Sequence, residues 1–284
     1  MDWRGREESS NVEDRRGRGV KGAFGGLGIA GIILYLVLSF MGVDVGPLLT
    51  GGDPSPGQPQ QQSQPYQETA EEKELRQFAS VLLKDTEDVW TKIFQDNGLN
   101  YTKPILVIYT GATQSACGTG QSAMGPFYCP ADTRVYLDLN FYNDLRNRFK
   151  APGDFAMAYV IAHEVGHHVQ NQLGTMDKVT ALRSKMSEKE FNQYMVRLEL
   201  QADYYAGVWA KHVQGKGYLE KGDLEEAINA ASAVGDDRLQ KQTRGYITPD
   251  SFTHGTSEQR MRWFKRGFER GTLQGGNTFT NDPI

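Results

Sequence analysis

Cysteine is almost absent from this sequence of 284 residues, in which only Cys117 and Cys129 occur. Two thiols are too few for a zinc site with four cysteine ligands, and they do not form a C-x-x-C pair, so both kinds of site are excluded. An excess of positive charge is also lacking, because the net charge is -4 and both signs are scattered along the chain. Without a basic stripe for phosphate contacts, a nucleic-acid-binding function is excluded.

Internal repeats are absent as well, and 38% of the residues are hydrophobic and 23% charged, as in an ordinary globular protein. The length is sufficient for one sizeable folded domain with additional segments. We expect this domain to cover residues 68–284.

The longest apolar run covers residues 22–43, GAFGGLGIAGIILYLVLSFMGV, and contains no charged residue. Its length predicts one transmembrane helix. No convincing signal-peptidase site follows it, which favours a retained anchor over a cleaved signal peptide. Several basic residues precede the run, and no other occurs between it and Lys73. They are Arg4, Arg6, Arg15, Arg16, Arg18 and Lys21.

This asymmetry of charge predicts the orientation of the chain in a membrane. By the positive-inside rule, residues 1–21 form a cytoplasmic tail and the chain after the apolar run is exported. We therefore expect a single-pass protein of the cell membrane whose folded domain is periplasmic or extracellular. Residues 44–67 are rich in Pro, Gly, Gln and Ser and predict a linker. Because an exported compartment is oxidising, a Cys117–Cys129 disulfide is favoured over two buried thiols.

Local signals predict the helices of the domain. Thr69 and Glu72 have the spacing of a capping box, and apolar residues recur at helical spacing from there to Asn97. After Phe149 the pattern is again helical, with start signals S-x-x-E at 187–190 and D-x-x-E at 223–226. The helices expected there cover residues 154–172, 187–213, 223–234 and 256–270.

A small sheet is expected between the first helix and the later ones. Residues 105–110 are apolar and β-branched, and residues 133–139 alternate apolar with polar side chains, so both predict strands. The Gly- and Ser-rich residues 111–129 predict a loop with an irregular edge strand. The order of helix, small sheet and helices gives an α+β fold.

The candidate chemistry lies in the helix expected at 154–172. Residues 155–162 are apolar on almost every side, so this helix should be buried, yet it contains His163, Glu164 and His167. Histidines four residues apart lie on one helix face, and their ring nitrogens can meet at one zinc ion about 2 Å away. Glu164 then faces the open coordination position, where it can take a proton from a water whose pKa the metal lowers to about 7. The alternative of a solvated histidine face conflicts with the apolar neighbours.

A catalytic zinc needs a third protein ligand and leaves its fourth position to water. A third histidine six residues after His167 is excluded, because that position is leucine. Glu199 and Asp203 lie four residues apart on one face of the next long helix, beside an apolar stripe. Glu199 suits the third ligand of one Zn²⁺ per chain, and Asp203 can accept the other N–H of a ligand histidine, most readily His163. The alternative is an ordinary solvated pair of carboxylates.

The motifs H-E-V-G-H-H, E-L-Q-A-D, G-P-F-Y-C-P and S-F-T-H-G-T-S-E-Q-R together resemble those of a bacterial family of neutral zinc metallopeptidases, the YpfJ-like proteins. The resemblance covers nearly the whole chain. The metal motif is shared with other gluzincins, so the G-P-F-Y-C-P and C-terminal motifs are more specific. The resemblance implies a zincin-like fold, in which a small antiparallel sheet packs on the helices that hold the metal, and zinc-dependent cleavage of peptides or proteins.

The same resemblance implies roles for His254 and Arg260. Related membrane peptidases have a similar His and Arg after the metal helices, and these meet the substrate or the developing oxyanion. His254 would then donate a hydrogen bond to the tetrahedral intermediate, with a structural helix cap as the alternative. The relatives usually have Pro where this chain has Gly255. Of the remaining histidines, His168 is expected to be packed or solvent-facing, and His212 to be a cation at a helix C-terminus.

Two other functions remain open. A zinc hydrolase of another amide or ester class would need the same metal site. A non-catalytic, membrane-tethered binding module could use the metal as a structural pin, although the intact Glu164 and a set of only three protein ligands argue against it. For a peptidase, we expect an extended substrate to pair with an edge strand within about residues 115–127, above the zinc.

Overall fold

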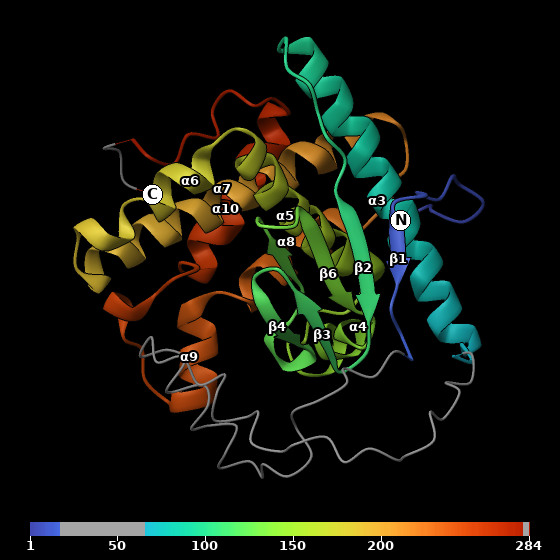
Figure 1. Cartoon of the computed structure of the whole chain (residues 1–284), viewed down its shortest axis with the longest axis horizontal. Coiled ribbons are helices and arrows are strands. Elements are labelled where there is room, and N and C mark those ends of the chain that lie inside the picture. Colours follow the sequence, from blue (N-terminus) through green and yellow to red (C-terminus); the bar gives the residue numbers. More distant parts are fainter. Residues whose placement is uncertain (18–65, 281–283) are drawn as a thin grey trace, which may run out of the picture. The chain divides into compact units, whose positions relative to one another are not determined.

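A computed structural model describes residues 1–17, 66–280 and 284 (Figure 1). Residues 1–16 and 67–284 form one compact unit. The predicted membrane helix at 22–43 and almost all of the predicted linker lie outside the described residues, so both stay predictions. Among the helices that are described, none combines the length and apolarity needed to cross a bilayer.

The main sheet has four strands in the order β1-β2-β6-β5. Their bounds are Val12–Asp14 for β1, Ile105–Tyr109 for β2, Arg134–Asp138 for β6 and Phe127–Cys129 for β5. The β1–β2 and β2–β6 pairs are parallel, and only β5 runs antiparallel to its neighbour β6. The expectation of an antiparallel sheet is therefore wrong. The chain between β2 and β6 is long enough for the crossover that parallel strands require.

The region expected to be a loop with an irregular strand forms a hairpin of β3 (Ala112–Ser115) and β4 (Gly118–Gln121), followed by a 3₁₀ turn at Ser122–Met124. A disulfide joins Cys117 in the hairpin turn to Cys129 at the end of β5, as predicted. Gly120 faces Phe127, whose ring would lie 2.4 Å from an added Cβ atom. A side chain at this position would push the hairpin away from β5.

The predicted helices are present, with ends within two residues of those expected. They are α3 (Ala70–Asp96), α5 (Asp154–Gln172), α7 (Glu188–Gly215), α8 (Asp223–Ala233) and α10 (Ser257–Arg270). Capping boxes formed by Thr69 with Glu72 and by Ser187 with Glu190 begin α3 and α7. Asp223 does not cap α8, because its carboxylate accepts a hydrogen bond from the Glu220 N–H before the helix.

Three short helices were not predicted, namely α4 (Phe141–Asn147), α6 (Thr175–Thr180) and α9 (Asp236–Arg244). Helix α5 contacts β5 and β6 of the sheet and also α7 and α8, so it is buried on nearly every side. The α+β class is confirmed, and the helix that carries the H-E-x-x-H motif lies at the centre of the domain (Figure 1).

Glycines bring the long helices close together. At Gly166 on α5, an added Cβ atom would lie 2.9 Å from the carbonyl oxygen of Ala202 on α7. At Gly207 on α7 and Gly267 on α10, added Cβ atoms would lie 2.0 and 1.9 Å from backbone oxygens of the facing helix. The sequence therefore allows α5, α7 and α10 to approach through their backbones, which sets the distances between the polar side chains that they carry.

The N-terminal segment also belongs to this unit, which differs from the expected separate tail at 1–21. Strand β1 adds to the free edge of β2, and the side chains of Met1 and Trp3 are buried, with exposures of 4% and 8%. Trp3 packs edge-on against Phe78 of α3, with ring centroids 5.4 Å apart. A tail of polar and basic residues gave no periodic signal long enough to predict this strand.

Candidate metal centre

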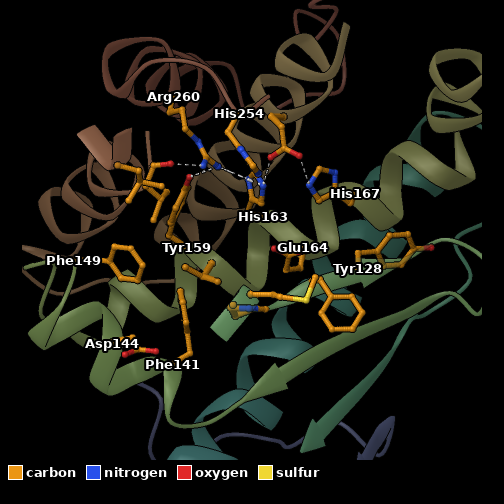
Figure 2. A pocket seen from close by; sticks show the side chains of 18 of the residues that line it. Tyr128, Phe141, Asp144, Phe149, Tyr159, His163, Glu164, His167, His254 and Arg260 are labelled. Carbon is orange, nitrogen blue, oxygen red and sulfur yellow. Dashed lines mark hydrogen bonds and ion pairs between the residues drawn. The ribbon is translucent and has the colours of Figure 1, made fainter. Parts of the chain in front are cut away.

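Helices α5 and α7 bring together three side chains of types that can bind a metal (Figure 2). The Nε2 atom of His163 lies 3.1 Å from Glu199 Oε2, and the Nε2 atom of His167 lies 3.5 Å from Glu199 Oε1. One ligand atom from each residue lies within 4.8 Å of the other two. Two imidazoles and one carboxylate converging in this way fit a single zinc ion with one position left open.

The second nitrogen of each histidine is held by a buried acceptor. His163 Nδ1 lies 2.8 Å from Asp203 Oδ1, and His167 Nδ1 lies 2.8 Å from the side-chain oxygen of Gln170. An N–H donated from Nδ1 leaves the lone pair of Nε2 directed at the shared point. The contact between Asp203 and His163 agrees with the expectation. Gln170 was not singled out, although its place three residues after His167 on one helix face could have suggested it.

Gln170 also connects the two metal-bearing helices. Its amide nitrogen donates to the Leu198 carbonyl at 2.6 Å and lies 3.1 Å from the side-chain oxygen of Gln201, both on α7. The side chain is fully buried. The contacts of Gln170 to α7 require the close approach of α5 and α7 at Gly166. Gly166 and Gln170 together therefore determine the position of His167 relative to α7.

Arg260 lies behind His163 and is bound to Asp203. Its Nε and Nη2 atoms contact the two carboxylate oxygens at 2.8 and 2.9 Å, and Nη2 lies 3.1 Å from the Tyr159 hydroxyl. The Tyr159 hydroxyl in turn donates to Asp203 at 2.5 Å. Burial would raise the pKa of Asp203, but Arg260 and His163 hold this pKa below its ordinary value. Asp203 therefore stays ionised as the acceptor for His163.

Glu164 has different surroundings from the other carboxylates. It is 8% exposed, and within the described part of the chain its carboxylate makes no hydrogen bond or ion pair. Burial raises its pKa above the ordinary value. By contrast, the pKa of Glu199, which burial alone would raise, is held well below its ordinary value by His167, His254 and His163. One carboxylate is thus fixed as an anion and the other is poised to exchange a proton.

His254 approaches the same space from the loop before α10 (Figure 2). Its backbone N–H donates to Asp236 Oδ2 at 2.6 Å, and its Nδ1 lies 3.3 Å from Asp236 Oδ1. Asp236 is the first residue of α9, which was not predicted, so sequence reasoning missed this support. Gly255, in the same loop, has a φ of +88°, a backbone conformation that proline cannot adopt.

A cleft of about 580 Å³ opens over Glu164, a size that can hold several residues of a peptide. One wall is the segment 122–128, which includes the 3₁₀ turn and the start of β5. Phe141 and Phe149 also line the cleft, together with Asp144 and Arg148, and Figure 2 shows Asp144 beside Phe141. Strand β5 pairs only with β6 among the described strands, so its other edge is unpaired there.

The two remaining histidines lie away from this centre. His168 is fully buried, with Nδ1 3.0 Å from the Tyr128 hydroxyl and Nε2 2.7 Å from the Thr102 carbonyl. It is therefore a packed histidine, one of the two expectations for it. His212 lies in the last turn of α7, and its Nε2 is 2.9 Å from the Gly271 carbonyl.

Comparison with known proteins gives the same family as the sequence motifs. The sequence model of the family described as "Putative neutral zinc metallopeptidase" matches residues 1–279. "Uncharacterized protein YpfJ" of Escherichia coli K12 is 51% identical over 98% of this chain and 99% of its own length. "Uncharacterized protein Rv2575" of Mycobacterium tuberculosis H37Rv is 41% identical over 63% of this chain and 64% of its own.

No solved structure matches the chain. Because the family model spans nearly the whole sequence and the E. coli relative aligns from end to end, this chain belongs to the family described as "Putative neutral zinc metallopeptidase".

Proposed function

We propose that this protein is a zinc-dependent peptidase in which His163, His167 and Glu199 bind one zinc ion per chain. One observation carries the proposal: the Nε2 atoms of both histidines face the Glu199 carboxylate, while each Nδ1 is held by a buried acceptor. A structural zinc site would fill all four positions with protein ligands, and here three converge. A zinc ion held by these three side chains would take water as a further ligand.

Zinc at this position supplies Lewis acidity to the attacking water and to the scissile carbonyl. In the proposed mechanism Glu164 takes the proton of that water and passes it to the leaving amine. His254, oriented by Asp236, donates a hydrogen bond to the oxygen on which negative charge develops. For Arg260 we propose a positioning role beside the expected contact with substrate, because its Nε and Nη2 atoms are engaged with Asp203 and Tyr159 next to His163.

We propose that the peptide lies extended along the cleft wall at residues 125–127. The expected strand edge at 115–127 is interrupted, because most of that segment is used by the hairpin and the 3₁₀ turn. The segment that follows them lines the cleft and leads into the unpaired edge of β5. Backbone pairing there would hold the scissile carbonyl at a fixed height above Glu164 without requiring particular side chains.

The compartment is proposed on two grounds. The Cys117–Cys129 disulfide is typical of an oxidising, exported environment. The apolar run at 22–43 favours attachment to a membrane. The domain would then act on peptides or proteins outside the cytoplasm.

The experiment that tests the function uses the full chain purified in detergent. We expect about one zinc per chain by elemental analysis and cleavage of members of a peptide library. Glu164→Gln should keep the zinc and abolish cleavage, because an amide cannot accept the proton. Glu225→Gln, an exposed change on α8, is the matched control and should behave as the parent does. A chain without zinc, or cleavage that survives Glu164→Gln, would reject the proposed mechanism.

A further inference from the structure

The N-terminal segment is paired with the domain through backbone hydrogen bonds. The Leu106 N–H of β2 donates to the Asn11 carbonyl at 2.9 Å, and the Arg15 N–H donates to the Ile108 carbonyl at 2.7 Å. Between these contacts, residues 12–14 match residues 106–108 in parallel register. Since the other edge of β2 is taken by β6, this segment completes the sheet on the side of α3 (Figure 1).

Polar groups of the segment also find partners inside the domain. The Met1 ammonium lies 2.8 Å from Asp154 on α5, 3.0 Å from Glu220 and 3.3 Å from Asp223 on α8. The Ser9 hydroxyl donates to Glu87 of α3 at 2.6 Å, where both side chains are buried. These contacts can form only if the N-terminal segment and the domain are on the same side of a membrane.

Of the basic residues that predicted a cytoplasmic tail, the four that the structure describes are paired with carboxylates, and Arg18 and Lys21 lie outside the described residues. Arg6 bonds Asp85, Arg4 bonds Glu74, and Arg16 contacts Glu68 at 2.6 Å and Asp14 at 2.5 Å. Arg15 contacts Glu13 at 2.8 Å. Three of these partners lie on α3 or directly before it. The charge of these four arginines is therefore used within the folded unit, partly in contacts that join the segment to the domain.

We propose that residues 1–16 and 67–284 lie in one compartment, so that the N-terminal segment is on the same side of any membrane as the folded domain. A single crossing between residues 16 and 67 would place β1 and β2 in different compartments and break all the contacts between the N-terminal segment and the domain. The proposal replaces the expected cytoplasmic N-terminus and leaves the proposed exported position of the domain as it is. It does not depend on the zinc site or on peptidase activity.

Thiol labelling tests this directly, because both cysteines of the chain are in the disulfide and leave no free thiol. Ser10→Cys marks the N-terminal segment and Gln242→Cys marks the domain, and both positions are exposed. Each variant of the full chain is expressed in bacteria and treated with a membrane-impermeant maleimide in right-side-out and in inverted vesicles. Detergent-solubilised protein, in which both thiols must react, is the control.

We expect Ser10→Cys and Gln242→Cys to react in the same vesicle preparation and to be protected in the other. Protein found free of the membrane would have both positions in one compartment, which agrees with the proposal. Labelling of the two positions in opposite preparations would overturn it.

A second measurement tests whether the segment is docked in the membrane-extracted protein. Arg6 is 15% exposed, contacts the buried Asp85 and lies over the Tyr218 ring at 3.5 Å from its centroid, whereas Arg4 and its partner Glu74 are mostly exposed. Arg6→Ala should lower the Tm by on the order of 5 °C, and Arg4→Ala should leave it nearly unchanged. An equal Tm for both variants and the parent chain would mean that the segment is not docked.

Discussion

Gln170 shows how a residue that binds no metal can control a metal ligand. It accepts from His167 Nδ1 and donates to Leu198 on α7. Gln170→Leu removes both contacts and leaves the imidazole free to rotate, so we expect the zinc affinity to fall about 10- to 100-fold. Competition with a zinc chelator measures this. Gln172→Leu, on the same helix but bonded to Thr102, is the control and should keep the affinity of the parent.

His254 and Arg260 should separate in kinetic tests, because the His254 side chain is about half exposed in the cleft, whereas Arg260 is buried and paired with Asp203. His254→Ala should lower kcat roughly 100-fold, which is about 3 kcal/mol, with zinc content unchanged. Arg260→Ala should instead weaken zinc binding, since it leaves Asp203 buried without its main partner. Zinc titration and steady-state kinetics on one peptide distinguish these two effects. Full activity of the His254→Ala variant would mean that His254 has no role in catalysis and serves only its contacts to Asp236 and Thr253.

At this scale the sequence predicted which side chains converge better than it predicted the residues that support them. His163, His167 and Glu199 follow from spacing within single helices. Asp236 could not be predicted as the partner of His254, because the contact depends on where α9 places its first residue.

At the scale of elements, the approach of α5 to α7 is set by Gly166. An alanine there would place its Cβ 2.9 Å from the Ala202 carbonyl and push the helices apart, which separates Glu199 from the histidines. We expect Gly166→Ala to lower both the Tm and the zinc affinity. Gly215→Ala at the end of α7 meets no atom within 4 Å and should be neutral or slightly stabilising. Equal zinc affinities in these two variants would contradict the argument.

The disulfide belongs to the same scale, because it ties the β3–β4 hairpin to β5 beside the cleft. Replacing Cys117 and Cys129 together with serine should loosen the segment 122–128 that lines the cleft. KM for a peptide should then rise, while zinc content and the ligand geometry stay as they are. Unchanged peptide kinetics in the double variant would show that the hairpin needs no such support and would weaken the proposed substrate path.

Elements were predictable where their signals are local. The capping boxes of α3 and α7 and their apolar periodicity fix these helices without help from the rest of the chain. Strand pairing is not local, so the parallel register of β2 with β6 could not be read from either strand. The short β1 has a polar sequence and depends wholly on the edge of β2.

For the whole molecule, the N-terminal arginines have a structural use that the sequence did not predict. Arg4, Arg6 and Arg16 pair with carboxylates on α3 or directly before it, as Arg6 does with Asp85. A fragment starting at residue 68 would lack these partners and leave the β2 edge open. Stability measurements therefore belong on the full chain.

The Met1 amino group makes the stability of the whole molecule depend on pH. Burial lowers its pKa, but Asp154 and Glu220 more than offset this and raise the pKa from 8.0 to about 10. Below pH 8 the group is charged in both the folded and the unfolded chain, so its full stabilising contribution is present. As the pH rises from about 8 to 10 the unfolded chain loses the proton first, and the contribution declines until it is lost above the folded pKa.

We therefore expect a chain with a free amino group at Met1 to have a higher Tm at pH 7.5 than the same chain acetylated at its N-terminus, and the difference should shrink by pH 10.5. Other groups titrate in this range, but they are common to both chains and cancel in the difference. Thermal unfolding at several pH values in one buffer series measures it. A Tm difference that stays constant over this range would mean that the charge of the Met1 ammonium does not stabilise the fold. Its contacts to Asp154 at the start of α5 and Asp223 at the start of α8 would then contribute nothing through charge.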